Sequence, residues 1–247
     1  MRKMSEKMLT LERFEEASEI VKKVSQETKL VYSDFYSAQT GNKVYFKPEN
    51  MQFTGAYKLR GAYYKISTLT EEERSKGLIT ASAGNHAQGV AYAAKCFGVK
   101  AVIVMPTTTP LIKVNRTKGY GAEVVLHGDV YDEACEKAYE LAKEHGYTFI
   151  HPFDDPAVAT GQGTIAMEIF KELPVVDYIL VPVGGGGLAT GVSTLAKLLN
   201  PKIKVIGVEP EGANCLQESM KAGKVLTLDH VSTIADGTAV KIGRAHV

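Results

Sequence analysis

The sequence predicts an α/β protein with open, twisted, mainly parallel sheets flanked by helices. Two observations lead to this fold class. From residue 78 onward, short apolar runs alternate with helical stretches, which is the order that parallel βαβ units require. The runs are also apolar on both faces, as expected of parallel strands buried between helices. With 247 residues, 45% of them hydrophobic, the chain can build one large or two medium domains.

The N-terminal part is predicted to contain one helix and one short strand. Apolar residues recur at helical spacing and Thr10 can cap them; these residues are Leu11, Phe14, Ala17, Ile20, Val21 and Val24. The run VYF at 44–46 reads as a strand that leads into the loop PENMQFTGAYK at 48–58.

Six further strands are expected, and the intervening stretches are expected to be helical. The strands are 78–83, 101–106, 123–127, 147–151, 178–183 and 205–209. The clearest helix is 132–146, whose buried stripe would consist of Ala134, Ala138, Leu141 and Ala142. No repeat or low-complexity tract interrupts this order.

Composition excludes several classes of function. The net charge is +1, which gives no electrostatic attraction toward nucleic acid or membranes. The N-terminus has no apolar core of a signal peptide, and no apolar stretch is long enough to span a bilayer. Because Cys96, Cys135 and Cys215 are widely spaced, we interpret them as reduced thiols of a cytoplasmic protein.

Polar or glycine-rich turns follow several of these strands, where α/β proteins place ligands. In SAGNHAQG at 82–89, Ser82, Asn85 and His86 with free N–H groups at a helix start would suit a carboxylate, although a capped helix without a ligand fits equally well. No G-x-S-x-G surrounds Ser82, which argues against a hydrolase. The turn TGAYKLRGA at 54–62 holds Lys58, which alone would be read as a surface lysine, and IADG at 234–237 is uninformative by itself.

The turn VPVGGGGLATG at 181–191 predicts a phosphate site. Four consecutive glycines between a buried strand and a helix let backbone N–H groups converge on an anion. A competing reading is a nicotinamide-dependent dehydrogenase. Gly184, Gly186 and Ala189 satisfy G-x-G-x-x-A, and Glu209 ends the next strand where a ribose-binding acid belongs.

The combination of motifs decides between these readings. TGAYKLRGA, SAGNHAQG, HPFDDP (151–156), GQGT (161–164), GGGGL, VIGVEPE and ADG stand in this order. As a set, from about residue 11 to residue 241, they resemble the threonine dehydratases among the fold-type II (β-family) pyridoxal-phosphate enzymes. The resemblance implies a tryptophan-synthase-β-like fold. Its large cofactor domain would comprise 1–51 and 154–241, and its small domain 52–153.

By this resemblance, Lys58 forms the Schiff base with pyridoxal phosphate, and Asn85 hydrogen-bonds the ring hydroxyl. The backbone N–H groups expected to hold the cofactor phosphate are those of Gly184, Gly185, Gly186, Gly187 and Leu188. The loop expected to close on the substrate carboxylate consists of Ser82, Ala83, Gly84 and His86. No metal ligand is expected.

The implied reaction removes water and ammonia from L-threonine or L-serine and gives 2-oxobutanoate or pyruvate. Lys58 would act as the general base once the cofactor has made the Cα proton removable. Similar enzymes are homodimers or homotetramers. The sequence does not choose between threonine and serine, or between isoleucine biosynthesis and a catabolic role, and it does not reveal effectors or a regulatory domain.

Two other pyridoxal-phosphate readings stay open, a serine racemase and a catalytically silent relative. Racemases carry a second serine where this chain has Ala83, and alanine cannot exchange a proton. They also bind a divalent metal at positions that correspond to Glu209, Ala213 and Cys215, where a carboxylate is lost. Both departures favour elimination. A further departure is Ala56-Tyr57 before the lysine, where the family usually has Ser-Phe.

The C-terminal end departs from the family pattern. Residues 242–247, IGRAHV, can be encoded by a widely used sequencing-adapter string, so we interpret them as an artefact and the chain as truncated at its C-terminus. In similar enzymes the partner of the pyridine nitrogen lies beyond the position of Val247. The chain as printed is therefore expected to bind the cofactor weakly.

Overall fold

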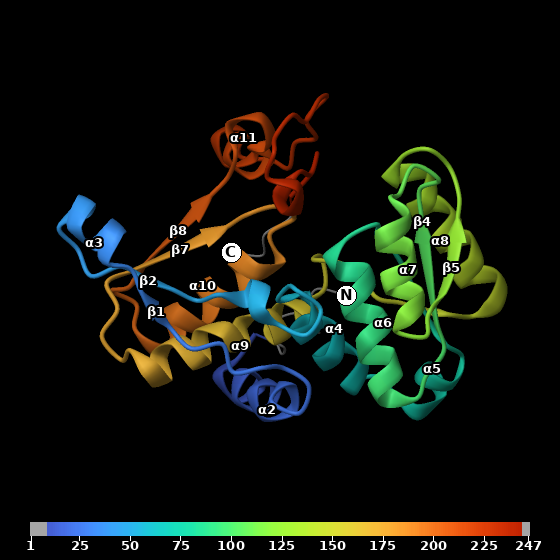
Figure 1. Ribbon diagram of the computed structural model, residues 1–247, viewed down its shortest axis with the longest axis horizontal. Coiled ribbons are helices and arrows are strands. Elements are labelled where there is room, and N and C mark those ends of the chain that lie inside the picture. The colour runs from blue at the N-terminus through green and yellow to red at the C-terminus, as the bar shows by residue number, and fades with distance from the viewer. Residues whose placement is uncertain (1–8, 244–247) are drawn as a thin grey trace.

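The computed structural model describes residues 9–243 and has the predicted α/β architecture. Figure 1 shows two groups of elements with α4 (Lys58–Ser67) between them. Residues 1–8, part of the N-terminus expected to lack a signal peptide, lie outside the described residues, as do residues 244–247 of the suspected adapter segment. Within residues 9–243, no helix is both long and apolar enough to cross a membrane.

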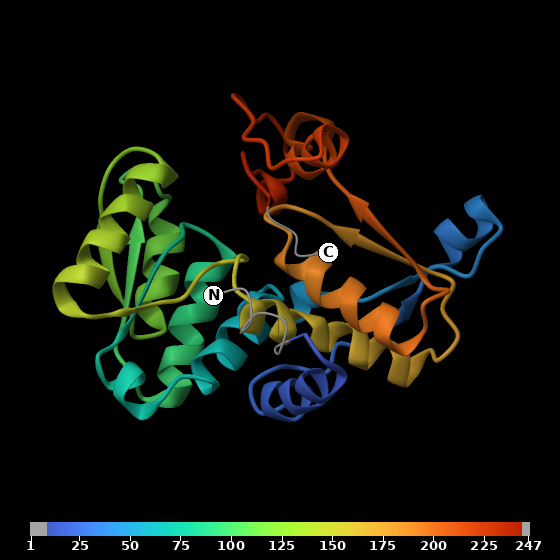
Figure 2. The same ribbon diagram turned by 180° about the vertical axis from the view of Figure 1, so that it is seen from behind.

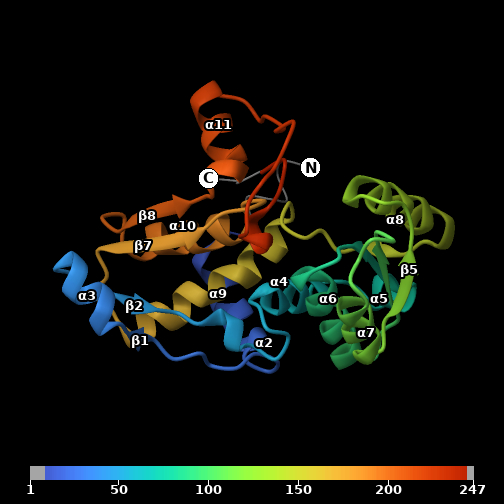
Figure 3. The ribbon, with the colours of Figure 1, turned by 45° about the horizontal axis from the view of Figure 1, so that its top comes forward.

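The N-terminal helix α2 (Leu11–Val21) forms where the apolar spacing predicts it. The hydroxyl of Thr10 accepts a hydrogen bond from Arg13 N (3.4 Å), and Phe14 and Ala17 are buried. An antiparallel pair follows, β1 (Val31–Tyr32) and β2 (Tyr45–Phe46), joined by α3 (Asp34–Thr40). The sequence pattern indicated β2 but not β1 or α3. Figure 3 shows that α3 lies at the far end of the molecule from β5 and α8.

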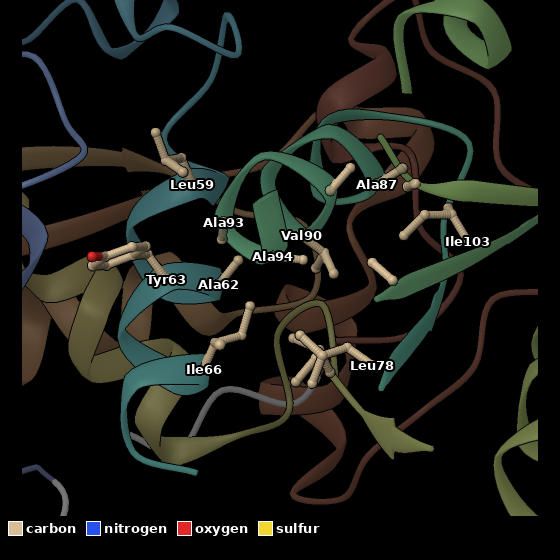
Figure 4. Close-up of a cluster of buried hydrophobic side chains, with 14 of the residues drawn as sticks. Leu59, Ala62, Tyr63, Ile66, Leu78, Ala87, Val90, Ala93, Ala94 and Ile103 are labelled. Carbon is tan, nitrogen blue, oxygen red and sulfur yellow. The ribbon is translucent and has the colours of Figure 1, made fainter. Parts of the chain in front are cut away.

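The four-stranded sheet has the parallel order β5-β4-β3-β6. Its strands are β3 (Leu78–Ala81), β4 (Ala101–Met105), β5 (Glu123–Leu126) and β6 (Thr148–Phe149). Helix α6 (Asn85–Phe97) covers one face with α4 packed against it, and Leu78 and Ile103 join the cluster shown in Figure 4. Helix α8 (Tyr131–His145) covers the other through Ala134 and Ala138. Two-sided burial explains why β3 and β4 read as continuous apolar runs, whereas the edge strands β5 and β6 are only partly buried.

The second parallel sheet pairs β7 (Tyr178–Pro182) with β8 (Lys204–Val208). Helix α10 (Gly187–Leu199) packs on one face with α9 (Pro156–Glu172) beside it, as Figure 2 shows. The expectation that every strand is covered on both faces is wrong here for the described part of the chain. Leu180 is 65% and Ile206 44% exposed, because α10 contacts only the face to which Ile179 and Val181 point.

The remaining elements connect these layers. They are α5 (Glu71–Ser75), α7 (Leu111–Gly119), α11 (Cys215–Ala222) and the 3-10 turns η1 (Glu49–Met51), η2 (Glu211–Ala213) and η3 (Asp236–Thr238). A buried ion-pair network ties α4 to α9 and η1. Arg60, which is fully buried, contacts Glu49 (2.8 Å) and Glu168 (2.6 Å). Through Arg60, the first turn of α4 is therefore fixed to both η1 and α9.

Replacing Gly191 by alanine is expected to lower the free energy of unfolding by about 1–3 kcal/mol. Helices α9 and α10 cross there so closely that a Cβ on Gly191 would lie 2.1 Å from Ala159 O and 2.7 Å from Gly163 N. Because both atoms belong to the backbone, one helix must shift. Urea denaturation measures the effect.

The control for this prediction is Gly119→Ala at the end of α7, where a Cβ meets nothing within 4 Å. That variant is expected to gain up to about 1 kcal/mol from helix propensity. Equal effects of the two substitutions would contradict the close crossing of α9 and α10.

Candidate active site

Lys58 is the first residue of α4. Its Nζ donates a hydrogen bond to the carbonyl oxygen of Pro152 (2.5 Å) and lies 5.6 Å from the centre of the Tyr57 ring. Burial lowers the pKa of Lys58 to about 8, because desolvation disfavours the charged amine. At about pH 7.5 roughly a quarter of the amine is then uncharged, against roughly one part in a thousand for an ordinary lysine. Lys58 can therefore serve as a base or a nucleophile.

His86 lies in the first turn of α6 and is 3% exposed. Its Nε2 is 3.0 Å from the carbonyl oxygen of Ile150. Since a carbonyl only accepts, Nε2 carries the proton, and Nδ1 is a buried acceptor without a hydrogen-bond partner among residues 9–243. Burial, and then the charge of Lys58, lower the pKa of His86 to about 3. The ring is neutral near pH 7 and offers Nδ1 to a donor.

The glycine turn between β7 and α10 has the backbone geometry of an anion site. Gly186 has φ = 98° and precedes α10, which no side chain caps. A Cβ on Gly185 would lie 2.3 Å from the Phe153 ring, and one on Gly187 would lie 2.9 Å from Phe153 O. The free N–H groups and the helix dipole at this end both favour a negatively charged group. Leu188 follows in the first turn of α10.

The segment directly after β6 joins these three features. Ile150 O contacts His86, Pro152 O contacts the amine of Lys58, and the Phe153 ring lies against the glycine turn. Sequence reasoning included HPFDDP only in the family pattern and assigned no site role to Pro152 or Phe153. Their position directly after the parallel strand β6 was the available signal.

The predicted substrate loop connects β3 to α6. Ser82 N donates to Val104 O (3.1 Å), and Ser82 Oγ accepts from Gly84 N (3.2 Å). Ala83 lies between them, and Asn85, which begins α6, is exposed. Because the N-cap residue Gly84 has no side chain to cap α6, the first N–H groups of this helix can bind a carboxylate. The structure thus places this loop beside His86. It also places IADG next to the glycine turn, since a Cβ on Gly184 would lie 3.2 Å from the Cα of Thr238, the residue that follows IADG.

Glu209 is engaged in capping a helix. Its two carboxylate oxygens accept hydrogen bonds from Leu216 N (3.0 Å) and Gln217 N (2.8 Å) at the start of α11. This use competes with the ribose contact that a dehydrogenase would need.

A hollow of about 970 Å³ between α2 and α9 is lined mainly by glutamates, and Lys58 does not line it.

Lowering the pH from about 7 to about 5 is expected to destabilise the wild-type protein by roughly 2 kcal/mol more than a His86→Gln variant. The pKa of His86 falls from 6.5 to about 3 on folding. Between these values the unfolded chain binds a proton that the folded chain does not, so stability is complete above pH 6.5 and decreases below it.

Urea denaturation at both pH values measures this difference. The control is His145→Gln, because His145 is an exposed histidine at the end of α8. If all three proteins showed the same pH dependence, the buried neutral state of His86 would be refuted.

Comparisons with known proteins agree with this geometry. The family described as pyridoxal-phosphate dependent enzyme matches residues 21–246. The chain is 50% identical over 234 residues to an L-threonine ammonia-lyase of Thermotoga maritima, covering 95% of this chain and 58% of the relative. It is 53% identical over 218 residues to a biosynthetic L-threonine dehydratase of Pasteurella multocida, covering 88% of this chain and 42% of the relative. The chain therefore spans about half the length of these relatives.

Two solved structures share the fold. The processed form of threonine deaminase isoform 2 from Solanum lycopersicum superimposes with a TM-score of 0.90 at 45% identity, covering 94% of this chain and 68% of that one. Maize serine racemase also reaches a TM-score of 0.90, at 37% identity, covering 94% of this chain and 70% of that one.

Proposed function

The chain belongs to the pyridoxal-phosphate dependent enzymes, and from this premise we propose that it eliminates water and ammonia from L-threonine, and from L-serine. The observation that carries the proposal is the convergence of Lys58, His86 and the glycine turn on residues 150–153. The names of relatives that are about half identical to this chain support threonine as the substrate.

The residues present fit pyridoxal phosphate. Lys58 offers an amine of low pKa for the aldehyde, and the turn Gly184–Leu188 offers uncapped N–H groups at a helix start for the phosphate. The backbone of this turn passes so close to Phe153 that any side chain on Gly185 or Gly187 would collide with it. When bound, the cofactor supplies an electron sink that makes the Cα proton of an amino acid removable.

The chain's own residues then have separate tasks. Lys58, freed from Pro152 O, accepts the Cα proton as an uncharged amine. The first turn of α6 with residues 82–84 binds and orients the substrate carboxylate. Asn85 is placed at this start of α6 and is assigned to the ring hydroxyl of the cofactor. His86 stays neutral and therefore adds no positive charge that would raise the cost of protonating Lys58.

Serine racemase is the second candidate, favoured by the TM-score of 0.90 to the maize enzyme. Racemisation needs a proton donor on the face opposite Lys58. Ala83 stands where similar racemases carry a serine, so the chain lacks that donor at this position. Elimination is the better supported of the two reactions.

The assembly and the domains complete the proposal. We propose a cytoplasmic homodimer or homotetramer with a small domain at 52–153 and a large one at 1–51 and 154–241. The sheet β3–β6 lies wholly within the first range, and β7–β8 lies within the second, which supports the division. Size-exclusion chromatography with light scattering tests the assembly, and a monomer would overturn that part.

The reaction is tested on the longest form of the protein that its gene encodes, supplied with pyridoxal phosphate and L-threonine. We expect release of 2-oxobutanoate and ammonia, and an absorption band that borohydride shifts while attaching the cofactor to Lys58. Formation of D-allothreonine from L-threonine, or of D-serine from added L-serine, without keto acid would identify a racemase. A trapped band without any product would identify a silent relative, and no band with bound NAD would identify a dehydrogenase.

A further inference from the structure

The helix that begins at Lys58 is not capped by its own sequence. The side chain of Tyr57, the residue before α4, makes no capping hydrogen bond, and Arg60 N donates to Tyr57 O (2.9 Å), a tight bond of the 3-10 type. The next amide, Gly61 N, donates instead to the side-chain Oε1 of Gln162 (3.1 Å), which belongs to α9. Gln162 is 1% exposed, so this bond is fully buried.

The surrounding contacts leave no room for another acceptor at Gly61 N. A Cβ on Gly61 would lie 2.3 Å from Gln162 Nε2 and 2.7 Å from Val158 O. A Cβ on Gly161 would lie 2.7 Å from Arg60 O. The backbones of α4 and α9 thus approach closely one turn after Lys58, and the amide of Gln162 fills the space beside Gly61.

Helix α6 contacts the opposite side of the same turn. A Cβ on Gly89 would lie 3.0 Å from both Leu59 N and Lys58 C. Figure 4 shows Ala62 of α4 near Ala93 of α6, and both share one buried cluster with Leu59 and Val90. Helix α6 therefore packs against the peptide unit of Lys58, while Gln162 of α9 binds the first turn of α4.

We propose that Gln162 is a positioning residue, which fixes the first turn of α4 and thereby the amine of Lys58 through its hydrogen bond to Gly61 N. The motif GQGT, singled out in the sequence without a role, gains one by this assignment. The inference rests on the proposed function of Lys58, but neither measurement below requires turnover.

The amine of Lys58 reports on this turn. The groups that face it are Tyr57 on the preceding residue, His86 from α6 and the Pro152 carbonyl from the segment after β6. Substituting Gln162 alters the chemical identity of none of these three groups. If the first turn opens, water reaches the amine and its pKa rises from about 8 toward the ordinary 10.5.

Two variants separate the hydrogen bond from general stability. Gln162→Met keeps the length of the side chain and removes the acceptor, whereas Gln162→Glu keeps an acceptor oxygen. Ile165→Ala weakens the same helix in a cluster whose buried members include Phe14 and Ile179 but no residue of α4; from that side only Tyr57, the residue before α4, packs against it. Hydrogen exchange of Gly61 N is followed by NMR, and the pH dependence of Lys58 acetylation is followed by mass spectrometry, both on the cofactor-free protein, in which the amine is free.

We expect exchange at Gly61 to be roughly 10-fold faster or more in Gln162→Met, with a higher pKa of Lys58. Gln162→Glu should retain slow exchange, and Ile165→Ala should retain both wild-type values. Unchanged exchange and pKa in Gln162→Met, or the same changes in Ile165→Ala, would overturn the proposal. If Gln162→Met does not fold, the wild-type protein decides, because unprotected exchange at Gly61 would also overturn it. Failure of the proposed function would appear separately, as absent keto acid.

Discussion

Replacing Lys58 by alanine is expected to reduce keto-acid release from L-threonine by at least about 10³-fold. The substitution removes the only amine that the segment 150–153 holds beside the glycine turn within the described part of the chain. It also removes the group whose pKa of about 8 lets it exchange protons near neutral pH. Steady-state rates at saturating cofactor measure the loss.

Two controls make this result specific to Lys58. Lys95→Ala removes an exposed lysine on α6 and should leave the rate unchanged. Added ethylamine should restore part of the activity of Lys58→Ala, because a small base can occupy the space left by the side chain. Full activity of Lys58→Ala would disprove the role of Lys58, and failure of the amine to restore activity would argue that the lysine positions other groups.

Replacing Arg60 by methionine is expected to lower the free energy of unfolding by about 3–5 kcal/mol and the melting temperature by roughly 6–20 °C. The guanidinium is fully buried and bonds Glu49 through Nε and Glu168 through a terminal nitrogen. Lys47 also contacts Glu168 (2.5 Å). Without Arg60, both carboxylates stay in a site from which water is largely excluded, and Lys47 is paired with only one of them, Glu168.

The matched control is Arg13→Met. Arg13 pairs with Glu16 on the surface, where both side chains are more than 40% exposed, and exposed pairs contribute at most about 1 kcal/mol. Thermal and urea denaturation of both variants test the contrast. Similar losses in the two variants would show that burial of the Arg60 network adds nothing.

The family, the cofactor and the α/β fold class expected from the sequence are confirmed. Strand positions could be predicted because strands such as β3 and β4 are covered on both faces, with Ile79 buried on one face and Ile103 on the other. Continuous apolar runs mark such strands. The short strand Val31–Tyr32 gave no signal, because two exposed residues carry no periodicity. The exposed face of β7 and β8 was mispredicted, because apolar composition does not say what covers a strand.

The candidate site was only partly accessible to sequence reasoning. Its turns could be found because glycines and polar residues follow apolar strands. Contacts across the chain could not, since Lys58 and Pro152 are 94 positions apart, and Arg60 and Glu168 are 108 apart. The assignment of roles to the site residues stays a prediction.

The segment from Ile150 to Phe153 has a consequence for how the protein can vary. Its carbonyls and ring reach three different partners in consecutive steps of the backbone. Inserting or deleting one residue there would displace all three contacts at once, whereas a longer surface connection elsewhere costs little. We therefore expect natural variants of this protein to differ in loop length at many places. They should keep a constant number of residues between Ile150, whose carbonyl contacts His86, and Phe153, whose ring lies beside the glycine turn.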